Sequence, residues 1–299
     1  MTAQTARAAL ITGASGKLGR QAAEFALARF RPERLILVTR NPDAVADLAG
    51  QGAEVRFGDF ADPASLRPAF AGPARMLLIS NTELARRNEQ HSAAVEAAAA
   101  AGVKHVIYTS IVGADPPNPA VVAPGHYFTE QAIARSGMKW TFLRNSFYAD
   151  YQVPEALRAI ESRSIVHNRG AGRIAYVARD DCAAVAAVVL MEGGHEGVTY
   201  DVTGPQAYSA PELAALYGEL GGKKIEATEL DDEAFVEGIV AARSGDDHAR
   251  YGAELVASFG RAIREGYMAS CTDTVAKLTG RPALTLREVI EPRLRAAKP

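Results

Sequence analysis

The chain has 299 residues, more than one hydrophobic core usually organises, so a large domain with a smaller appended one is expected. Hydrophobic residues make up 48% and charged residues 23%, an ordinary globular balance that excludes a disordered or fibrous protein. The formal net charge of -2 argues against a general attraction to nucleic acid or to anionic membranes.

Neither export nor membrane insertion is indicated. Residues 1–7 lack the apolar core of a secretory signal, and no apolar run approaches the roughly 20 residues that a spanning helix needs. We therefore expect a cytoplasmic protein that acts on a small-molecule substrate, with neither nucleic acid nor membrane as a partner. A homodimer is left open.

The cysteines and histidines predict no special chemistry. Cys182 and Cys271 are far apart, and each lies in an apolar-periodic stretch that looks helical, so both are expected to be reduced structural thiols. The six histidines show no HxxxH or HExxH spacing, and the sequence therefore offers no metal site.

Short apolar runs alternate with helix-length segments over the first half of the chain. This alternation predicts an α/β fold, a Rossmann-type doubly wound parallel sheet with helices on both faces. The expected strands are residues 8–12, 35–39, 54–57, 75–80, 104–109 and 139–143.

The pattern becomes less regular after about residue 150. We therefore divide the chain into a dinucleotide-binding domain, residues 1–150, and a second, smaller α/β domain for the substrate, residues 151–299, some of whose elements return to the main sheet. Residues 232–239 and 256–267 suit either the lining of a pocket or an interface, and their periodicity does not distinguish the two roles. Further expectations are a strand pair within 165–177, a helix over 180–191, a strand over 198–202, a helix over 209–220 with a capping box from Ser209 to Glu212, and an exposed loop over 243–250.

The most informative segment is the glycine loop between the first strand and the first helix, with Gly13, Gly16 and Gly19 in a GxxGxxG spacing. Glycine allows a tight turn and close approach of the backbone to a pyrophosphate, and the helix start offers free N–H groups. A purely structural turn is the alternative. A P-loop does not fit, because Leu18 follows Lys17 where a magnesium-binding hydroxyl would be needed. From the same loop, Ser15, Lys17 and Leu18 are expected to contact the cofactor.

Arg40, at the end of the second expected strand, favours NADP(H) over NAD(H). An acid here would bind the ribose 2′-hydroxyl of NAD and repel a 2′-phosphate, whereas an arginine pairs with that phosphate. The alternative is an ordinary solvated charge. Asp59 and Phe60 follow the third strand and suit adenine, although Asp59 is equally suited to capping a helix. Ser80, Asn81 and Thr82 end the fourth strand and suit the ribose.

Together these motifs, with Leu-Leu-Ile-Ser at 77–80 and Tyr-Thr-Ser at 108–110, resemble the NmrA-like group of atypical short-chain dehydrogenases. Within it the likeness is strongest to the bacterial NAD(P)H:quinone oxidoreductases of type 2 and to triphenylmethane reductases. The resemblance implies NADPH across the strand ends, with Asn145, Phe147 and Tyr148 at its nicotinamide end. Thr109 and Gln131 are expected to contact the cofactor, and Ile111, Tyr127 and Tyr148 the substrate.

One departure from the family pattern concerns catalysis. Short-chain dehydrogenases use Ser with Tyr-x-x-x-Lys, where the lysine lowers the tyrosine pKa. The corresponding residues here are Ser110, Tyr127 and Gln131, so the candidate catalytic phenol lacks its cation. Three roles remain for Tyr127: it donates a proton, it packs against the substrate or cofactor, or it is purely structural.

Hydride transfer from NADPH to a quinone or similar conjugated electrophile is the leading hypothesis, because such an acceptor needs little acid catalysis. A reductase of aldehydes or ketones, or a nucleotide-dependent lyase or isomerase, working through Tyr127 is the second. A regulator that senses NADP(H) without turnover is the third.

Overall fold

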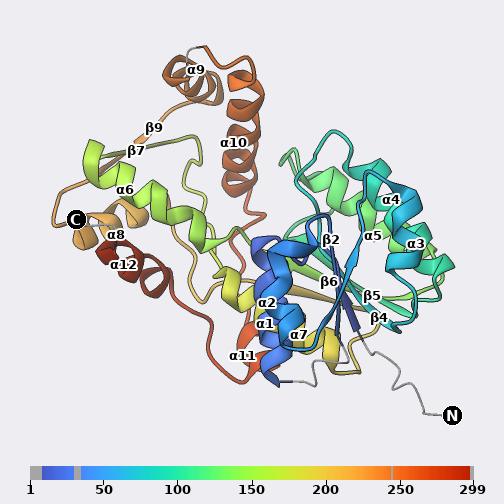
Figure 1. Ribbon diagram of the computed structural model, residues 1–299. Coiled ribbons are helices and arrows are strands. Elements are labelled where there is room, and N and C mark those ends of the chain that lie inside the picture. Colours follow the sequence, from blue (N-terminus) through green and yellow to red (C-terminus); the bar gives the residue numbers. More distant parts are fainter. Residues whose placement is uncertain (1–8, 30–34, 244, 297–299) are drawn as a thin grey trace, which may run out of the picture.

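Seven parallel strands form the central sheet, in the order β3-β2-β1-β4-β5-β6-β8 (Figure 1). The computed structural model describes residues 9–29, 35–243 and 245–296. The chain winds outward from β1 to β3, returns to β4 beside β1 and winds outward again, which is the order of a Rossmann-type sheet. The strands are β1 (Ala9–Ile11), β2 (Leu35–Thr39), β3 (Glu54–Phe57), β4 (Arg75–Leu78), β5 (His105–Ile111), β6 (Lys139–Asn145) and β8 (Val198–Val202).

Helices cover both faces of this sheet, which explains why its inner strands are largely buried along their length. All five residues of β2 and all seven of β5 are buried. One face packs against α1, α2, α7 and α11, and the opposite face against α3, α4 and α5. Their bounds are α1 (Lys17–Arg29), α2 (Ala46–Gly50), which follows the 3-10 turn η2 (Pro42–Val45), α3 (Pro63–Ala69), α4 (Arg87–Ala100), α5 (Ala123–Arg135), α7 (Arg179–Met191) and α11 (Thr274–Thr279).

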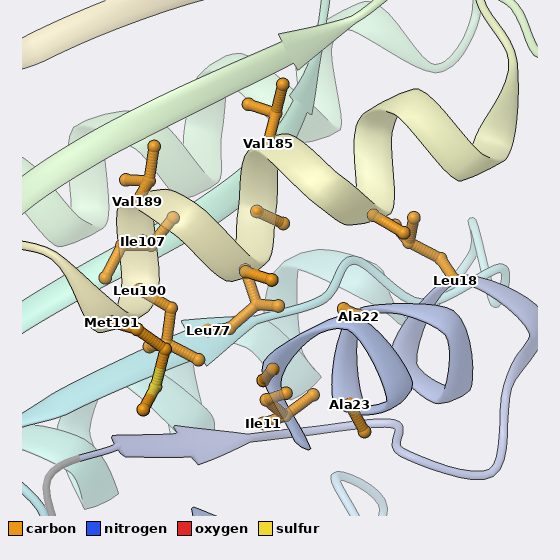
Figure 2. Close-up of a cluster of buried hydrophobic side chains, with 14 of the residues drawn as sticks. Ile11, Leu18, Ala22, Ala23, Leu77, Ile107, Val185, Val189, Leu190 and Met191 are labelled. Atoms are coloured by element: carbon orange, nitrogen blue, oxygen red, sulfur yellow. The ribbon is translucent and has the colours of Figure 1, made fainter. Parts of the chain in front are cut away.

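Small residues set the spacing between α1 and α7. Figure 2 shows Ala22 and Ala23 of α1 in one buried cluster with Val185 and Val189 of α7 and with Leu77 of β4. Alanine side chains let the two helices approach closely, and each large apolar side chain in the cluster contributes about 1.5–3 kcal/mol. The helix α7, from the second half of the chain, is thereby fixed to the first helix of the sheet.

A smaller unit with its own hydrophobic cluster lies beside the sheet (Figure 1). Ile165, Leu213, Tyr217 and Ile290 lie at its centre, and its two strands pair in parallel. Its elements are η3 (Ala149–Tyr151), α6 (Gln152–Ser162), β7 (Ser164–His167), α8 (Ala210–Gly221), β9 (Glu226–Glu229) and α12 (Leu286–Ala296).

Two helices, α9 (Asp232–Ala242) and α10 (Ala249–Arg264), form a hairpin that connects the two parts. The Asn168 side-chain amide donates to the carbonyl oxygen of Ala257 at 2.9 Å and to Asp232 at 2.8 Å, which attaches the hairpin to the smaller unit. The backbone N–H of Val121 donates to the Ser258 hydroxyl at 3.1 Å. Through this bond α10 also contacts the loop before α5.

Two expectations from the sequence are wrong. The strand pair within 165–177 does not form, because β7 pairs with β9 instead. A Cβ on Gly172 would lie 2.2 Å from the carbonyl oxygen of Ile263, so the chain at this glycine packs onto α10 rather than folding back on β7. Both cysteines were expected to be structural thiols within helices. Cys182 is buried in α7, but Cys271 is exposed and lies between α10 and α11.

Most other boundaries agree with the expectations to within two residues. The helix α8 begins after Ser209 with the expected capping box to Glu212. Residues 1–7, the first residue of the strand expected at 8–12 and Ser244 of the expected loop lie outside the described residues. Among the helices of the described part, none combines the length and apolar character needed to cross a membrane.

Candidate active site

The glycine loop joins β1 to α1 and leaves backbone N–H groups free at the start of that helix. Gly13 has a φ of 59°, a conformation that favours glycine. A Cβ on Gly19 would lie 2.3 Å from the carbonyl oxygen of Gly13, so α1 packs under the loop only with glycine there. The Thr12 hydroxyl donates to the carbonyl oxygen of Leu77 at 3.2 Å and ties the loop to β4.

A cavity of about 290 Å³ opens over the carboxyl ends of β1 to β4. Ligands of doubly wound sheets bind at this edge, beside the point where the strand order reverses. The residues expected from the sequence to bind a cofactor that line it are Gly13, Ser15, Gly16, Arg40, Asp59, Phe60, Ser80, Asn81 and Thr82.

Several other residues that line the cavity were not expected from the sequence. Glu83 and Gln90 are the polar ones with long side chains, and they follow the strand end that the sequence identified. Their proximity to Ser80–Thr82 along the chain was the available signal. The remaining lining residues are Thr12, Val38, Thr39, Gly58 and Ile79.

The corner of the cavity beside β2 is suited to an anion. The Thr39 hydroxyl donates to the Ser15 hydroxyl at 2.7 Å, and the backbone N–H of Asn41 donates to Thr39 at 3.1 Å. Arg40 is exposed at this corner, and its Nη1 lies 3.5 Å from the carboxylate of Glu83. Glu83 also accepts a hydrogen bond from the Gln90 amide at 2.8 Å.

Asp59 and Phe60 line the cavity just after the end of β3. One carboxylate oxygen of Asp59 accepts the backbone N–H of Ala61 at 2.9 Å, so this side chain shapes its own turn as well as the cavity wall. The Phe60 ring meets His91 edge to face, with the ring centroids 6.0 Å apart. Asp62, rather than Asp59, precedes the helix α3.

Buried polar side chains lie behind the cavity, between α4, α5 and β5. His91 Nδ1 is 2.9 Å from the Thr129 hydroxyl, and the Tyr108 hydroxyl is 3.0 Å from His126 Nδ1. Burial lowers the pKa of His126 well below its usual value, and the charge of Arg87 lowers it further. Burial raises the pKa of Tyr108. The imidazole of His126 and the phenol of Tyr108 are therefore neutral at pH 7.

Beyond the cavity, polar atoms at the ends of β5 and β6 lack partners. The buried Ser110 Oγ, Asn145 Oδ1 and Ser146 Oγ accept or donate no hydrogen bond within the described part of the chain. Thr109, one residue before Ser110, accepts the backbone N–H of Ser80 at 2.9 Å. Because buried polar atoms are almost always paired in native proteins, these orphans indicate a place for a ligand.

Tyr127 and Gln131 are one turn apart on α5, and both are half-buried. Neither lines the 290 Å³ cavity, and the unpartnered state of Ser110 means that no hydrogen bond joins it to Tyr127. The neighbouring Glu130 is buried and forms an ion pair with Arg144 at 2.7 Å, which fixes α5 to β6.

The segment after β6 joins the site to the smaller unit. The Phe147 ring meets Phe259 of α10 edge to face at 4.7 Å, and Ile111 packs in the same cluster of the smaller unit. The Asn145 amide is 3.4 Å from the Tyr148 hydroxyl, and the Arg179 guanidinium lies 5.1 Å from the centre of the Tyr148 ring. Burial raises the pKa of Tyr148.

Two loop residues stand apart from the rest of the expected cofactor set. The Leu18 side chain is buried in the core beneath α1 (Figure 2), so only its backbone can face a ligand. Lys17 is exposed and lines a second cavity, of about 570 Å³, together with Tyr151 and Arg179.

Known proteins resemble this chain in sequence over most of its length. Residues 13–192 match the family described as NAD(P)H-binding. The chain is 35% identical over 280 residues to quinone oxidoreductase 2 of Escherichia coli K12, a match that covers 94% of this chain and 96% of that protein. The chain belongs to the NAD(P)H-binding, NmrA-like family.

Solved structures agree with this assignment. The crystal structure of an NADPH-dependent quinone oxidoreductase from Escherichia coli in complex with NADPH matches with a TM-score of 0.90 at 34% identity, covering 96% of this chain and 99% of that one. Citrobacter triphenylmethane reductase in complex with NADP(H) matches with a TM-score of 0.86 at 36% identity, covering 95% and 99%. This NmrA-like chain is an NAD(P)H-dependent oxidoreductase.

The residues of this family member fit a dinucleotide. The loop leaves no room for a Cβ at Gly19, which keeps the start of α1 close to Gly13 and open to a pyrophosphate. Ser110 and Asn145 supply unpartnered polar atoms at the other end of the strand edge. Within the described ranges, no three His, Cys, Asp or Glu side chains are grouped closely enough to hold a metal ion.

Proposed function

We propose that this enzyme transfers a hydride from NADPH to a quinone or a similar conjugated electrophile. The observation that carries the proposal is that Tyr127, the candidate acid, has neither the lysine nor the serine hydrogen bond of the family pattern. Gln131 stands where the family pattern has lysine, and Ser110 makes no hydrogen bond to Tyr127. A carbonyl of a simple ketone needs a proton as it accepts hydride, whereas a quinone delocalises the charge. The names of the relatives, a quinone oxidoreductase and a triphenylmethane reductase, support the same class of acceptor.

For the adenosine half of the cofactor, we propose the residues of the glycine loop and of the first four strand ends. Backbone N–H groups of the loop would hold the pyrophosphate, and Arg40 with Ser15 would hold the 2′-phosphate that distinguishes NADPH. Asp59 and Phe60 would face the adenine. The full set is Gly13, Ser15, Gly16, Lys17, Leu18, Gly19, Arg40, Asp59, Phe60, Ser80, Asn81, Thr82 and Thr109.

For the reacting half, we propose Asn145, Gln131 and Phe147 beside the nicotinamide, which supplies the hydride when NADPH is bound. Asn145 and Gln131 are hydrogen-bonding side chains that would fix the orientation of the ring and its ribose. Ile111, Tyr127 and Tyr148 would face the substrate. Ser110 and Tyr127 each offer a hydroxyl to the oxygen that accepts charge, so they are the catalytic residues of the proposal.

The test is NADPH oxidation, followed by the absorbance of the reduced nicotinamide, with a panel of simple quinones, aldehydes and ketones and with NADH in parallel. We expect quinone-dependent oxidation that is faster with NADPH. Turnover confined to aldehydes or ketones would replace the proposal by a carbonyl reductase that works through Tyr127. Preference for NADH would overturn the role of Arg40.

We also propose a small-molecule substrate, in agreement with the names of the relatives, and a cytoplasmic location. Fractionation of cells that express the protein tests the location. A homodimer stays a prediction. Light scattering of the purified enzyme would support it with a mass of two chains and contradict it with a mass of one.

A further inference from the structure

Arg40 and Glu83 bridge the mouth of the cofactor cavity. Arg40 follows β2 and Glu83 comes after β4, so the two side chains extend from the strands that flank β1. The Arg40 guanidinium is 3.5 Å from the Glu83 carboxylate, and both residues line the cavity. Their side chains are 66% and 45% exposed, so solvent screens this ion pair and a more highly charged anion can displace Glu83 from Arg40.

Neutral groups hold Glu83 in this position independently of Arg40. The Gln90 amide donates to the Glu83 carboxylate at 2.8 Å, and the Gln90 carbonyl accepts the side-chain amide of Asn81. Gln90 is itself buried, at the first turns of α4. The carboxylate therefore stays at the cavity mouth when Arg40 turns toward another anion.

The hydroxyl of Ser15 lines the same cavity as Arg40 and Glu83. Because it accepts the Thr39 hydroxyl at 2.7 Å, it keeps its own O–H to donate. A phosphate in this corner would gain a guanidinium and a hydroxyl as donors, and it would compete with the Glu83 carboxylate for the guanidinium. The corner thus contains donors for a phosphate together with a carboxylate that already occupies one of them.

We infer that Glu83 competes with the cofactor 2′-phosphate for Arg40 and thereby reduces the preference of the enzyme for NADPH over NADH. This inference rests on the proposed binding of the 2′-phosphate by Arg40. NADH, which lacks the phosphate, leaves the Arg40–Glu83 pair intact and leaves no charge unpaired. NADPH has to separate the pair before Arg40 can bind it.

The test uses two nucleotide fragments that differ by the 2′-phosphate. Adenosine 2′,5′-bisphosphate and adenosine 5′-monophosphate are titrated into the whole enzyme by calorimetry at low ionic strength. Glu83→Gln keeps the shape of the side chain and removes its charge. We expect it to tighten the bisphosphate about fivefold and the monophosphate less than about twofold. No quinone is involved, so this result is independent of the proposed reaction.

Glu89→Gln is the matched control. Glu89 is an exposed acid in the first turn of α4, six residues after Glu83, paired with Arg86 at 3.3 Å, and the substitution makes the same change in net charge. We expect it to change the affinity for either fragment by less than about twofold. Equal effects of the two substitutions would overturn the inference, and so would weaker binding of the bisphosphate by Glu83→Gln, because Glu83 would then orient Arg40 for the phosphate.

A double variant tests the competition itself. In an Arg40→Ala background, the effect of Glu83→Gln on bisphosphate affinity should fall below about twofold, because no guanidinium remains to be competed for. An undiminished fivefold effect would assign Glu83 to direct repulsion of the phosphate and overturn the competition. If the wild-type enzyme bound neither fragment, the proposed cofactor site itself would be refuted.

Discussion

The imidazole Nε2 of His91 accepts a hydrogen bond from the backbone N–H of Asn81 at 3.2 Å, so a buried side chain of α4 holds the loop that follows β4. Its Nδ1 faces the Thr129 hydroxyl, which donates its hydrogen to the carbonyl oxygen of Gly125. The proton of His91 is therefore on Nδ1, and the ring is neutral. Burial, with a smaller effect of Arg87, lowers the pKa of His91 to about 3.

This arrangement predicts that acid destabilises the protein through His91. Below pH 6.5 the unfolded chain takes up a proton on this side chain, and the folded protein does not until about pH 3. The free energy of unfolding therefore falls as the pH decreases through this window, by about 1.4 kcal/mol per pH unit for one histidine. Urea unfolding at pH 5, 6 and 8 measures it. In His91→Gln we expect the free energy of unfolding to fall less steeply with decreasing pH, by the uptake of about one proton.

The measurement at pH 8 provides the control, since the imidazole is neutral there in both states and the variant loses only packing and hydrogen bonds. His126 also has a lowered pKa, but it is present in both proteins and cancels in the difference. Parallel curves for wild type and His91→Gln would contradict the prediction.

Gly19→Ala should damage cofactor binding and stability together. The new Cβ would lie 2.3 Å from the carbonyl oxygen of Gly13, and neither backbone segment can move without opening the loop. We expect a loss of about 1–3 kcal/mol in the free energy of unfolding and at least tenfold weaker NADPH binding, measured by fluorescence of the bound nicotinamide. Gly50→Ala is the control, because its Cβ meets nothing within 4 Å at the end of α2. If Gly19→Ala bound NADPH normally, the glycine would not be needed for the cofactor.

The elements that the sequence predicts well are those fixed by local chemistry. The strand β2 is an uninterrupted apolar run and is buried throughout. The capping box of α8 involves residues only three apart, and the Glu212 carboxylate accepts the backbone N–H of Ser209 at 2.8 Å. Glycine spacing similarly identified a loop that a Cβ would obstruct.

The sequence does not predict contacts between residues far apart in the chain. The pairing of β7 with β9 joins Ile165 to Ala227, and no local pattern distinguishes it from a hairpin within 165–177. Glu83 reaches the cavity because β4 lies beside β1, and this neighbour relation arises from the fold of the whole sheet. The exposure of Cys271 was not predicted either, because the apolar periodicity before it belongs to α10, which ends at Arg264.

Arg144 pairs with two acids, and we expect them to differ greatly in their contribution to stability. Its guanidinium donates twice to Glu130, at 3.0 and 2.7 Å, and also contacts Asp115. Glu130 is 2% exposed and Asp115 is 57% exposed. Glu130→Ala should cost about 3 kcal/mol in urea unfolding at pH 7, and Asp115→Ala less than about 1 kcal/mol. Equal losses would show that burial does not decide the strength of these pairs.

Tyr127→Phe separates the two roles that a hydroxyl on α5 can have in catalysis. If the hydroxyl only donates a hydrogen bond to the acceptor oxygen, its loss lowers kcat/KM for a simple quinone about three- to tenfold. A general acid contributes about 10²–10⁴-fold. We expect the smaller effect, because no lysine stands at Gln131 and Ser110 makes no hydrogen bond to Tyr127. The measurement is steady-state oxidation of NADPH with one quinone at pH 6, 7 and 8, with Phe128→Leu, a change at the neighbouring exposed ring, as control. A loss of a hundredfold or more that Phe128→Leu does not share would make Tyr127 a proton donor and would favour aldehydes and ketones as substrates.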